Sequence, residues 1–254
     1  MTGTTPQGTT TEQAASQWVR GMFGRIAPRY DLLNHLLSFN LDKRWRARTV
    51  ARVSEILDLP DAKVLDLCCG TGDVALALEA RRKNVHGCKP VMASDFCHPM
   101  LVEARRKIEA RHKRVAQRFS TPVFEADALS LPLADGSLDL ITVAFGFRNL
   151  ANYQRGLEEM LRVLKPRGVA AILEFSQPSS RVFRALYGFF STRILPRIGG
   201  MISGSPEAYS YLPESIRKFP GAEQLADEMR RAGFSRVDFE RMTGGAVALH
   251  LAYK

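Results

Sequence analysis

The chain has 254 residues, of which 45% are hydrophobic and 24% are charged, a balance typical of a soluble globular protein. No stretch approaches the ~20 uninterrupted apolar residues that a transmembrane helix requires. Residues 1–11 have neither a basic start nor an apolar centre, which argues against a signal peptide and predicts a disordered polar tail.

Cysteine usage and charge narrow the class further. The cysteines are Cys68, Cys69, Cys88 and Cys97. They form no C-x-x-C pair and have no histidine at zinc spacing, so we expect no metal site and a reducing, cytoplasmic location. The net charge of +10 favours an anionic partner, either nucleic acid or a membrane surface, although the basic residues at 105–114 also suit a solvated helix face.

From residue 63 onward, short apolar segments alternate with amphipathic ones. The segments predicted as strands are 63–67, 91–95, 122–126, 138–145, 168–175, 234–240 and 246–253. The segments predicted as helices are 72–82, 98–116, 152–164 and 221–232. This order predicts an α/β fold with a doubly wound, mostly parallel seven-stranded sheet that ends in a C-terminal antiparallel hairpin.

Two further segments are expected to decorate this sheet. Residues 12–60 predict two helices that form an N-terminal cap over the strand ends. Residues 179–220 predict a lid or substrate insertion. Its helix at 182–195 carries an aromatic stripe flanked by arginines, which suits either a lid packed on the domain or a helix at a membrane interface. Residues 12–254 are expected to form a single domain.

A glycine-rich turn follows the first predicted strand. Gly70 and Gly72 precede a helix start, an arrangement by which α/β folds hold nucleotide-like ligands. Residues 70–75 also fit the loose dinucleotide pattern G-x-G-x-x-[GA]. However, Asp66 and Asp73 place carboxylates where a dinucleotide would place its pyrophosphate. A cationic or neutral ligand such as S-adenosylmethionine (SAM) is therefore favoured.

Acidic residues also end the next two predicted strands. Asp95 could accept hydrogen bonds from both ribose hydroxyls of an adenosine, or it could cap the following helix. Asp127, with the backbone N–H of Ala128, could bind the adenine edge, or it could be a turn-forming aspartate. The order of glycines and carboxylates at successive strand ends resembles the motifs of class I SAM-dependent methyltransferases, which have a Rossmann-like fold.

A narrower resemblance covers nearly everything from Met22 to Lys254. Its motifs are M-F-x-x-I-A-x-x-Y-D-x-x-N at 22–34, D-x-x-W at 42–45, D-L-C-C-G-T-G-D at 66–73, F-G-F-R-N at 145–149, L-E-F-S-Q-P at 173–178, Y-L-P-E-S-I at 211–216 and T-G-G-x-x-A-L-H at 243–250. They resemble the ubiquinone/menaquinone biosynthesis C-methyltransferases. This resemblance implies methyl transfer from SAM to a ring carbon of a polyprenylated quinol, such as demethylmenaquinol, without separating naphthoquinol from benzoquinol substrates.

The resemblance also implies roles for single residues. Thr71, Asp95 and the pair Asp127 and Ala128 would bind SAM, the expected cofactor. Ala144 stands where the family often has serine, so a hydroxyl contact to the cofactor is absent at that position.

The chemistry requires that the quinol oxygen lose or share its proton while the ring is held near the methyl group. Arg148 and Asn149 follow the fourth predicted strand, where the substrate mouth of such a fold lies. Arg148 would stabilise the developing phenolate and Asn149 would hold a water or the ring oxygen, although a surface ion pair is the alternative role for Arg148. Tyr30, His35 and His250 are further candidates, Tyr30 for both catalysis and substrate binding and His250 for substrate binding. Packing of the cap is the alternative for Tyr30, and a buried strand histidine is the alternative for His250.

Three other functions stay open at this point. They are methylation of another small molecule, methylation or binding of nucleic acid, and a nicotinamide-dependent oxidoreduction. No Asn-Pro-Pro-Tyr motif and no aromatic–basic RNA signature supports the nucleic-acid alternative. The preferred prediction is a cytoplasmic enzyme, peripheral to the membrane, that methylates a polyprenylated quinol; a homodimer is compatible with this chain.

Overall fold

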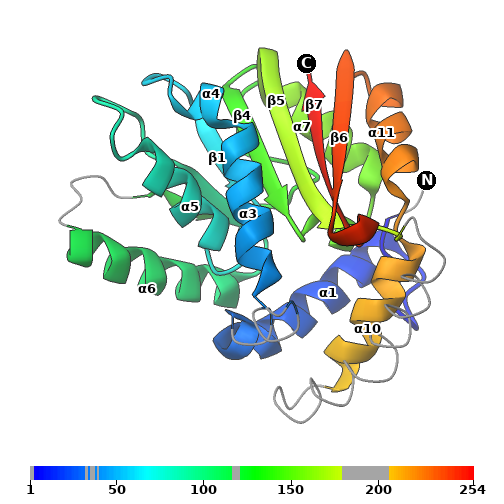
Figure 1. Ribbon diagram of the computed structural model, residues 1–254. Helices are drawn as coiled ribbons and strands as arrows, with labels where there is room; N and C mark the ends of the chain where they lie inside the picture. The colour runs from blue at the N-terminus through cyan, green and yellow to red at the C-terminus, as the bar shows by residue number, and fades with distance from the viewer. Residues whose placement is uncertain (1–2, 32–33, 35–37, 39, 116–120, 179–205) are drawn as a thin grey trace.

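A seven-stranded sheet forms the centre of the computed structural model, which describes residues 3–31, 34, 38, 40–115, 121–178 and 206–254 (Figure 1). The strands are β1 (Val64–Leu67), β2 (Met92–Asp95), β3 (Val123–Glu125), β4 (Leu138–Ala144), β5 (Leu164–Phe175), β6 (Arg236–Met242) and β7 (Val247–Tyr253). Their order in the sheet is β3-β2-β1-β4-β5-β7-β6. The first five are parallel, and β7 runs antiparallel to both β5 and β6. The predicted Rossmann-like sheet and its hairpin, closed by η4 (Thr243–Gly245), are confirmed.

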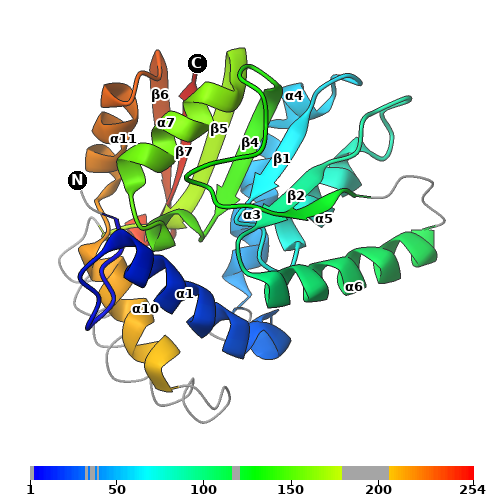
Figure 2. The ribbon, with the colours of Figure 1, turned by 180° about the vertical axis from the view of Figure 1, so that it is seen from behind.

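Helices cover both faces of the sheet (Figures 1 and 2). One face carries α3 (Leu41–Arg52), α4 (Ser54–Leu57) and α5 (Asp73–Arg82), with α6 (His98–Val115) beside α5. The other carries α7 (Tyr153–Val163) and α11 (Ala222–Arg231). Side chains alternate along a strand. Val64 of β1 therefore packs in the buried cluster under α3 and α5, and its neighbour Leu65 packs in the buried cluster under α7 and α11.

The cap differs from the expected arrangement of two helices over the strand ends. The helix α3 packs on the face of the sheet instead, because Trp45 and Val53 belong to the same buried cluster as Val64. The helix α1 (Glu12–Ile26), continued by η1 (Ala27–Arg29), lies across the carboxyl ends of the parallel strands beside α10 (Pro206–Lys218) (Figure 2).

Only part of the expected lid can be compared with the structure. The predicted helix at 182–195 lies outside the described residues. Within 206–218 the chain forms α10, whose Tyr211 packs on Trp18 of α1 with ring centroids 5.1 Å apart. None of the described helices is long and apolar enough to cross a membrane.

The prediction of a disordered tail over 1–11 is wrong for residues 3–5. The backbone N–H of Gly3 donates to the oxygen of Ala151 at 3.0 Å, and that of Thr4 donates to the oxygen of Leu150 at 2.8 Å. The Thr4 side chain is buried. The polar composition of this segment predicted disorder. The prediction failed because the partners that hold the segment lie more than a hundred residues away along the chain, where local composition gives no sign of them.

His250 is a structural histidine in the middle of β7. Its side chain is buried, and its Nε2 donates to the carbonyl oxygen of Ala222 on α11 at 2.8 Å. Burial lowers the pKa of His250 to about 4, from an ordinary value of 6.5. The surroundings of His250 therefore match the alternative given for it, a buried strand histidine, and its substrate-binding role stays a prediction.

This depressed pKa predicts a pH-dependent stability. Between pH 6.5 and 4 the unfolded chain binds a proton at His250 that the folded chain does not, so stability falls as the pH falls. From pH 7 to pH 5 the His250 contribution lost is about 2 kcal/mol. We expect the free energy of unfolding, measured with urea, to fall less between pH 7 and pH 5 in His250→Gln than in the parent protein. The difference should be about 2 kcal/mol. The exposed His86→Gln is the matched control, and equal pH dependence in all three proteins would contradict the assignment.

Candidate active site

A cavity of about 640 Å³, including the part open to solvent, lies at the carboxyl ends of the parallel strands. Six of the residues predicted for the site line it, namely Tyr30, Gly70, Asp95, Asp127, Ala128 and Asn149. Five others do not line it, namely Asp66, Thr71, Gly72, Arg148 and His250. His35 lies outside the described residues. The strand-end positions thus converge on one cavity because parallel strands end at the same edge.

Asp95 connects the end of β2 to the glycine turn. Its Oδ2 accepts from the backbone N–H of Gly70 at 2.9 Å, and its Oδ1 accepts from that of Cys97 at 2.9 Å. Burial raises the pKa of Asp95 above its ordinary value. The bond to Cys97 forms a turn ahead of α6, which begins at His98, so the predicted capping role is not seen. Asp95 lines the cavity, and its binding of a ribose stays a prediction.

Asp66 lies beneath the turn and not in the cavity. Its Oδ2 accepts from the backbone N–H of Ala75 at 3.0 Å, and its Oδ1 accepts from the Thr142 hydroxyl at 2.8 Å. Burial raises the pKa of Asp66 to about 7. In this structure the carboxyl group therefore joins β1 to β4 and α5, and any effect on a ligand would pass through the turn.

The glycines of the turn serve different needs. Both have positive φ angles, +54° for Gly70 and +84° for Gly72, which favour glycine. Gly70 lines the cavity, whereas a Cβ on Gly72 would lie 3.4 Å from the Cβ of Ala104 on α6. A side chain would therefore fit in the space at Gly72, and it is the positive φ that favours glycine there.

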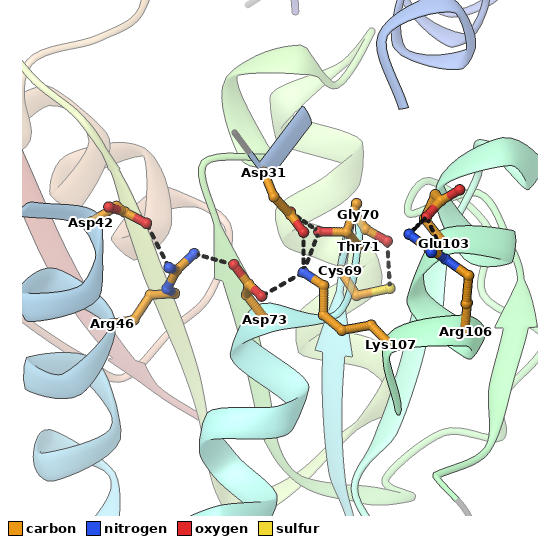
Figure 3. Close-up of polar contacts among 10 residues, drawn as sticks. All are labelled: Asp31, Asp42, Arg46, Cys69, Gly70, Thr71, Asp73, Glu103, Arg106 and Lys107. Atoms are coloured by element: carbon orange, nitrogen blue, oxygen red, sulfur yellow. Dashed lines mark hydrogen bonds and ion pairs between the residues drawn. The ribbon is translucent and has the colours of Figure 1, made fainter. Parts of the chain in front are cut away.

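Thr71 belongs to a polar network behind the turn (Figure 3). Its hydroxyl donates to Asp31 and accepts from Lys107 Nζ at 3.1 Å. Lys107 also contacts the carboxylates of Asp31 and, at 2.6 Å, Asp73. Arg46 of α3 contacts the other oxygen of Asp73 at 2.9 Å. The network ties the turn to α3, to α6 and to the segment after η1, and the SAM-binding role of Thr71 stays a prediction.

Asp127 and Ala128 follow β3. Asp127 is exposed, and its Oδ1 accepts from the backbone N–H of Leu129 at 2.9 Å, which is the predicted turn-forming role. Ala128 is buried beside it. Both residues still line the cavity, so the turn itself presents the carboxylate there.

Tyr30 closes the cavity from the side of α1. Its ring packs edge-to-face on Phe23 with centroids 6.0 Å apart, and its Cε1 would lie 3.5 Å from a Cβ on Gly70. Burial raises the pKa of Tyr30 above 10.0, so the phenol keeps its proton at neutral pH. Tyr30 therefore lines the cavity as a neutral phenol, and its catalytic and substrate-binding roles stay predictions.

Arg148 forms a buried ion pair, in place of the surface pair given as its alternative role. It belongs to η2 (Phe147–Asn149), and its Nη1 donates to Glu174 of β5 at 3.0 Å and to the Phe145 oxygen at 2.5 Å. The Arg148 Nε is buried without a hydrogen-bond partner among the described residues. Although burial lowers the pKa of Arg148, the Glu174 carboxylate raises it, and the net shift is upward. Arg148 remains a cation that directly precedes Asn149 in the chain.

Asn149 is the residue of η2 that reaches the cavity. Its Oδ1 accepts from the hydroxyl of Tyr211 at 2.9 Å, and its Nδ2 lies 3.4 Å from the oxygen of Phe145. Tyr211 lies in a sequence motif that predicted family membership, but its contact with Asn149 was not predicted.

The first helix of the predicted N-terminal cap, α1, contributes a wall of the cavity, but its lining residues were not predicted. Ser16 and Phe23 line the cavity opposite Phe96 and Met100, which follow β2. Phe96 was signalled by its position directly after Asp95. The cap prediction placed a helix from residues 12–60 over the strand ends, but it did not indicate which side chains of α1 would face the cavity.

The chain is similar over almost its whole length to proteins of one family. The family described as ubiE/COQ5 methyltransferase family matches residues 10–254. The chain is 48% identical to a demethylmenaquinone methyltransferase of Thermus thermophilus, covering 91% of this chain and 98% of the relative. It is 44% identical to a demethylmenaquinone methyltransferase of Deinococcus radiodurans, covering 96% and 95%. It is 39% identical to the ubiquinone/menaquinone biosynthesis C-methyltransferase UbiE of Idiomarina loihiensis, covering 93% and 90%.

Solved structures share the fold at low identity. A SAM-dependent methyltransferase from Aquifex aeolicus has a TM-score of 0.53 at 20% identity, over 80% of this chain and 88% of that one. The [4+2]-cyclase SpnF has a TM-score of 0.64 at 17% identity, over 100% and 99%. Neighbours of such different chemistry show the fold alone. Because the family match spans almost the whole chain and the relatives exceed 38% identity, the chain belongs to the ubiE/COQ5 methyltransferase family.

Proposed function

We propose that this protein transfers a methyl group from SAM to a ring carbon of a polyprenylated quinol, specifically demethylmenaquinol. The observation that carries the proposal is one cavity that joins Gly70, Asp95 and Asp127 on one side to Tyr30 and Asn149 on the other. The relatives at 48% and 44% identity are named demethylmenaquinone methyltransferases, which favours a naphthoquinol over a benzoquinol. Family membership sets aside the nicotinamide-dependent alternative.

The residues of the cavity fit SAM. Asp95 has lone pairs for ribose hydroxyls, and Asp127 with the Ala128 N–H would hold the adenine edge. At Gly146 a Cβ would lie 2.4 Å from the Cβ of Cys68, so only glycine lets the end of β4 approach the turn this closely. When bound, SAM supplies an electrophilic methyl group carried on a sulfonium.

The acceptor side of the cavity offers donors to a ring oxygen. Tyr30 keeps its O–H, and the Asn149 amide offers Nδ2–H. Burial raises the pKa of the Tyr30 phenol, and the Arg148 cation, which precedes Asn149 in the chain, is near enough to offset part of that rise. Preorganised donors and a fixed positive charge stabilise negative charge on a phenolic oxygen, and that charge makes the ring carbon nucleophilic. We therefore propose that the chain promotes loss of the quinol proton by stabilising the quinolate.

An assay with defined quinols tests this function. Purified protein incubated with SAM and reduced demethylmenaquinone should yield a product one methyl group heavier, detected by mass spectrometry. The oxidised quinone should not react, because its ring carbon is not nucleophilic.

A reduced benzoquinone of the same prenyl length is the matched control. Faster methylation of the benzoquinol would overturn the substrate assignment while leaving the reaction class intact. Absence of methylation of both rings, with SAM binding verified by calorimetry, would overturn the proposed function.

The ion pair of Arg148 and Glu174 predicts a specific pattern in variants. Arg148→Ala should lower the free energy of unfolding by about 3 kcal/mol, because it leaves a buried carboxylate unpaired. It should also lower turnover by about 100-fold or more, the scale of a lost charge-stabilising group.

The double variant Arg148→Ala/Glu174→Gln separates the two effects. Removing the unpaired charge should restore most of the stability, measured by urea unfolding, but not the turnover. SAM affinity, measured by calorimetry, should stay within a few-fold of the parent. Restored turnover in the stable double variant would remove Arg148 from the mechanism.

A lipophilic substrate implies contact with a membrane surface, and we infer that the exposed basic residues of α6 provide it. Arg105, Arg106, Arg111, Lys113 and Arg114 are all exposed. Anionic lipid contributes about 1 kcal/mol for each lysine or arginine near the surface, so several residues together support reversible binding.

Vesicle flotation tests the inferred membrane contact. The protein should float with vesicles containing anionic lipid at low salt, and Arg111→Glu/Arg114→Glu should reduce the floated fraction. Arg230→Glu/Arg231→Glu on α11 is the matched control. If the floated fraction changed neither with salt nor with the α6 substitutions, α6 would be excluded as the membrane-binding surface.

A further inference from the structure

The segment 3–5 lies against the wall of the cavity. The backbone N–H groups of Gly3 and Thr4 donate to the oxygens of Ala151 and Leu150 at 3.0 and 2.8 Å. Both acceptor residues line the cavity. Lys218 of α10 donates from its Nζ to the oxygen of Thr5 at 3.0 Å. The segment is therefore fixed between the cavity wall and α10.

The contact is too close for a side chain at position 3. A Cβ on Gly3 would lie 2.1 Å from the oxygen of Leu150 and 2.2 Å from the carbonyl carbon of Ala151. Both obstacles are backbone atoms, which cannot move aside as a flexible side chain would. Glycine at this position permits the approach that brings Thr4 to Tyr211.

A chain of hydrogen bonds runs from this segment to the active site. The Thr4 hydroxyl lies 2.8 Å from the Tyr211 hydroxyl, which donates to Asn149 Oδ1 at 2.9 Å. Burial raises the pKa of Tyr211, so its hydroxyl keeps its proton. Since that single proton points to Asn149, the proton between the two hydroxyls must come from Thr4.

The carbonyl oxygen of Phe145 can only accept a hydrogen bond, so it favours the orientation in which the Asn149 Nδ2 faces it and Oδ1 faces Tyr211. Oδ1 is occupied by Tyr211, and Nδ2 is directed to the side of the Phe145 oxygen, 3.4 Å away. The opposite orientation would place the amide oxygen against the carbonyl of Phe145, and Tyr211 would then accept from the amide N–H instead of donating to Oδ1. The bond to Phe145 is long, so Nδ2–H retains donor capacity for a ligand in the cavity.

We propose that Tyr211 and Thr4 are positioning residues that orient the Asn149 amide with its N–H available to the ring oxygen of the acceptor. The inference rests on the proposed role of Asn149 in holding that oxygen. Tyr211 acts directly on Asn149, and Thr4 acts through Tyr211 alone. Residues 3–5 are then part of the acceptor side of the site, although they lie far from it in the sequence.

A double-mutant cycle tests this order. Tyr211→Phe keeps the ring against Trp18 and removes only the hydroxyl, and it should lower kcat about tenfold, the scale of one lost positioning hydrogen bond. Thr4→Val should lower kcat about threefold, and Thr4→Ser should restore it. In the Tyr211→Phe background, Thr4→Val should have no further effect on kcat, because its only route is absent. The matched control is Thr10→Val, at an exposed threonine that lies outside residues 3–5 but near them in the sequence.

Two further measurements separate positioning from loss of structure. The dissociation constant of SAM and the hydrogen exchange of the Gly3 amide should match the parent protein in Tyr211→Phe. Additive effects of Thr4→Val and Tyr211→Phe, or parent-like kcat in Tyr211→Phe, would overturn the inference. If Asn149→Ala also kept parent turnover, the role of Asn149 in the proposed function would fail; if Asn149→Ala were slow while Tyr211→Phe was normal, only the positioning inference would fail.

Discussion

The buried carboxylate of Glu174 is the group to which the acceptor side of the cavity is tied. It accepts hydrogen bonds from the backbone N–H and the guanidinium of Arg148 and from the N–H of Phe175. These bonds hold η2 against the end of β5, and η2 carries Asn149 into the cavity. A buried carboxylate is stable only when it is paired, so this position constrains both the sequence of η2 and its orientation.

The cofactor side is tied by a second carboxylate in the same manner. Asp95 accepts the backbone N–H of Gly70, which fixes the glycine turn to the end of β2. The network of Lys107 with Asp31 and Asp73 supports the turn from behind. The site thus has two halves, each held by a buried acid at a strand end, and the donors proposed for the quinol lie between them.

The two halves differ in how far the sequence predicted them. The convergence of Gly70, Asp95 and Asp127 on one cavity was predicted because each lies at or just after the end of a strand, and parallel strands bring their ends together. Arg148 was placed near the substrate, and Glu174 lies in a motif used for the family resemblance, yet their pairing was missed because the two residues belong to separate segments of the chain. The docking of Thr4 on Tyr211 was missed because it joins residues 207 positions apart, which no local pattern encodes.

This difference follows from how each half is built. A turn and the strand ends beside it form a binding site from short-range geometry, so the same elements recur wherever the fold binds the same cofactor. The acceptor half is assembled from α1, η2, β5 and α10, and each donor depends on a contact with a distant element. Changing those contacts alters which oxygen can be held without disturbing the turn. If Asn149 holds the acceptor as proposed, specificity for the acceptor depends on tertiary contacts such as that between Tyr211 and Asn149, while the glycine turn depends on local chain geometry.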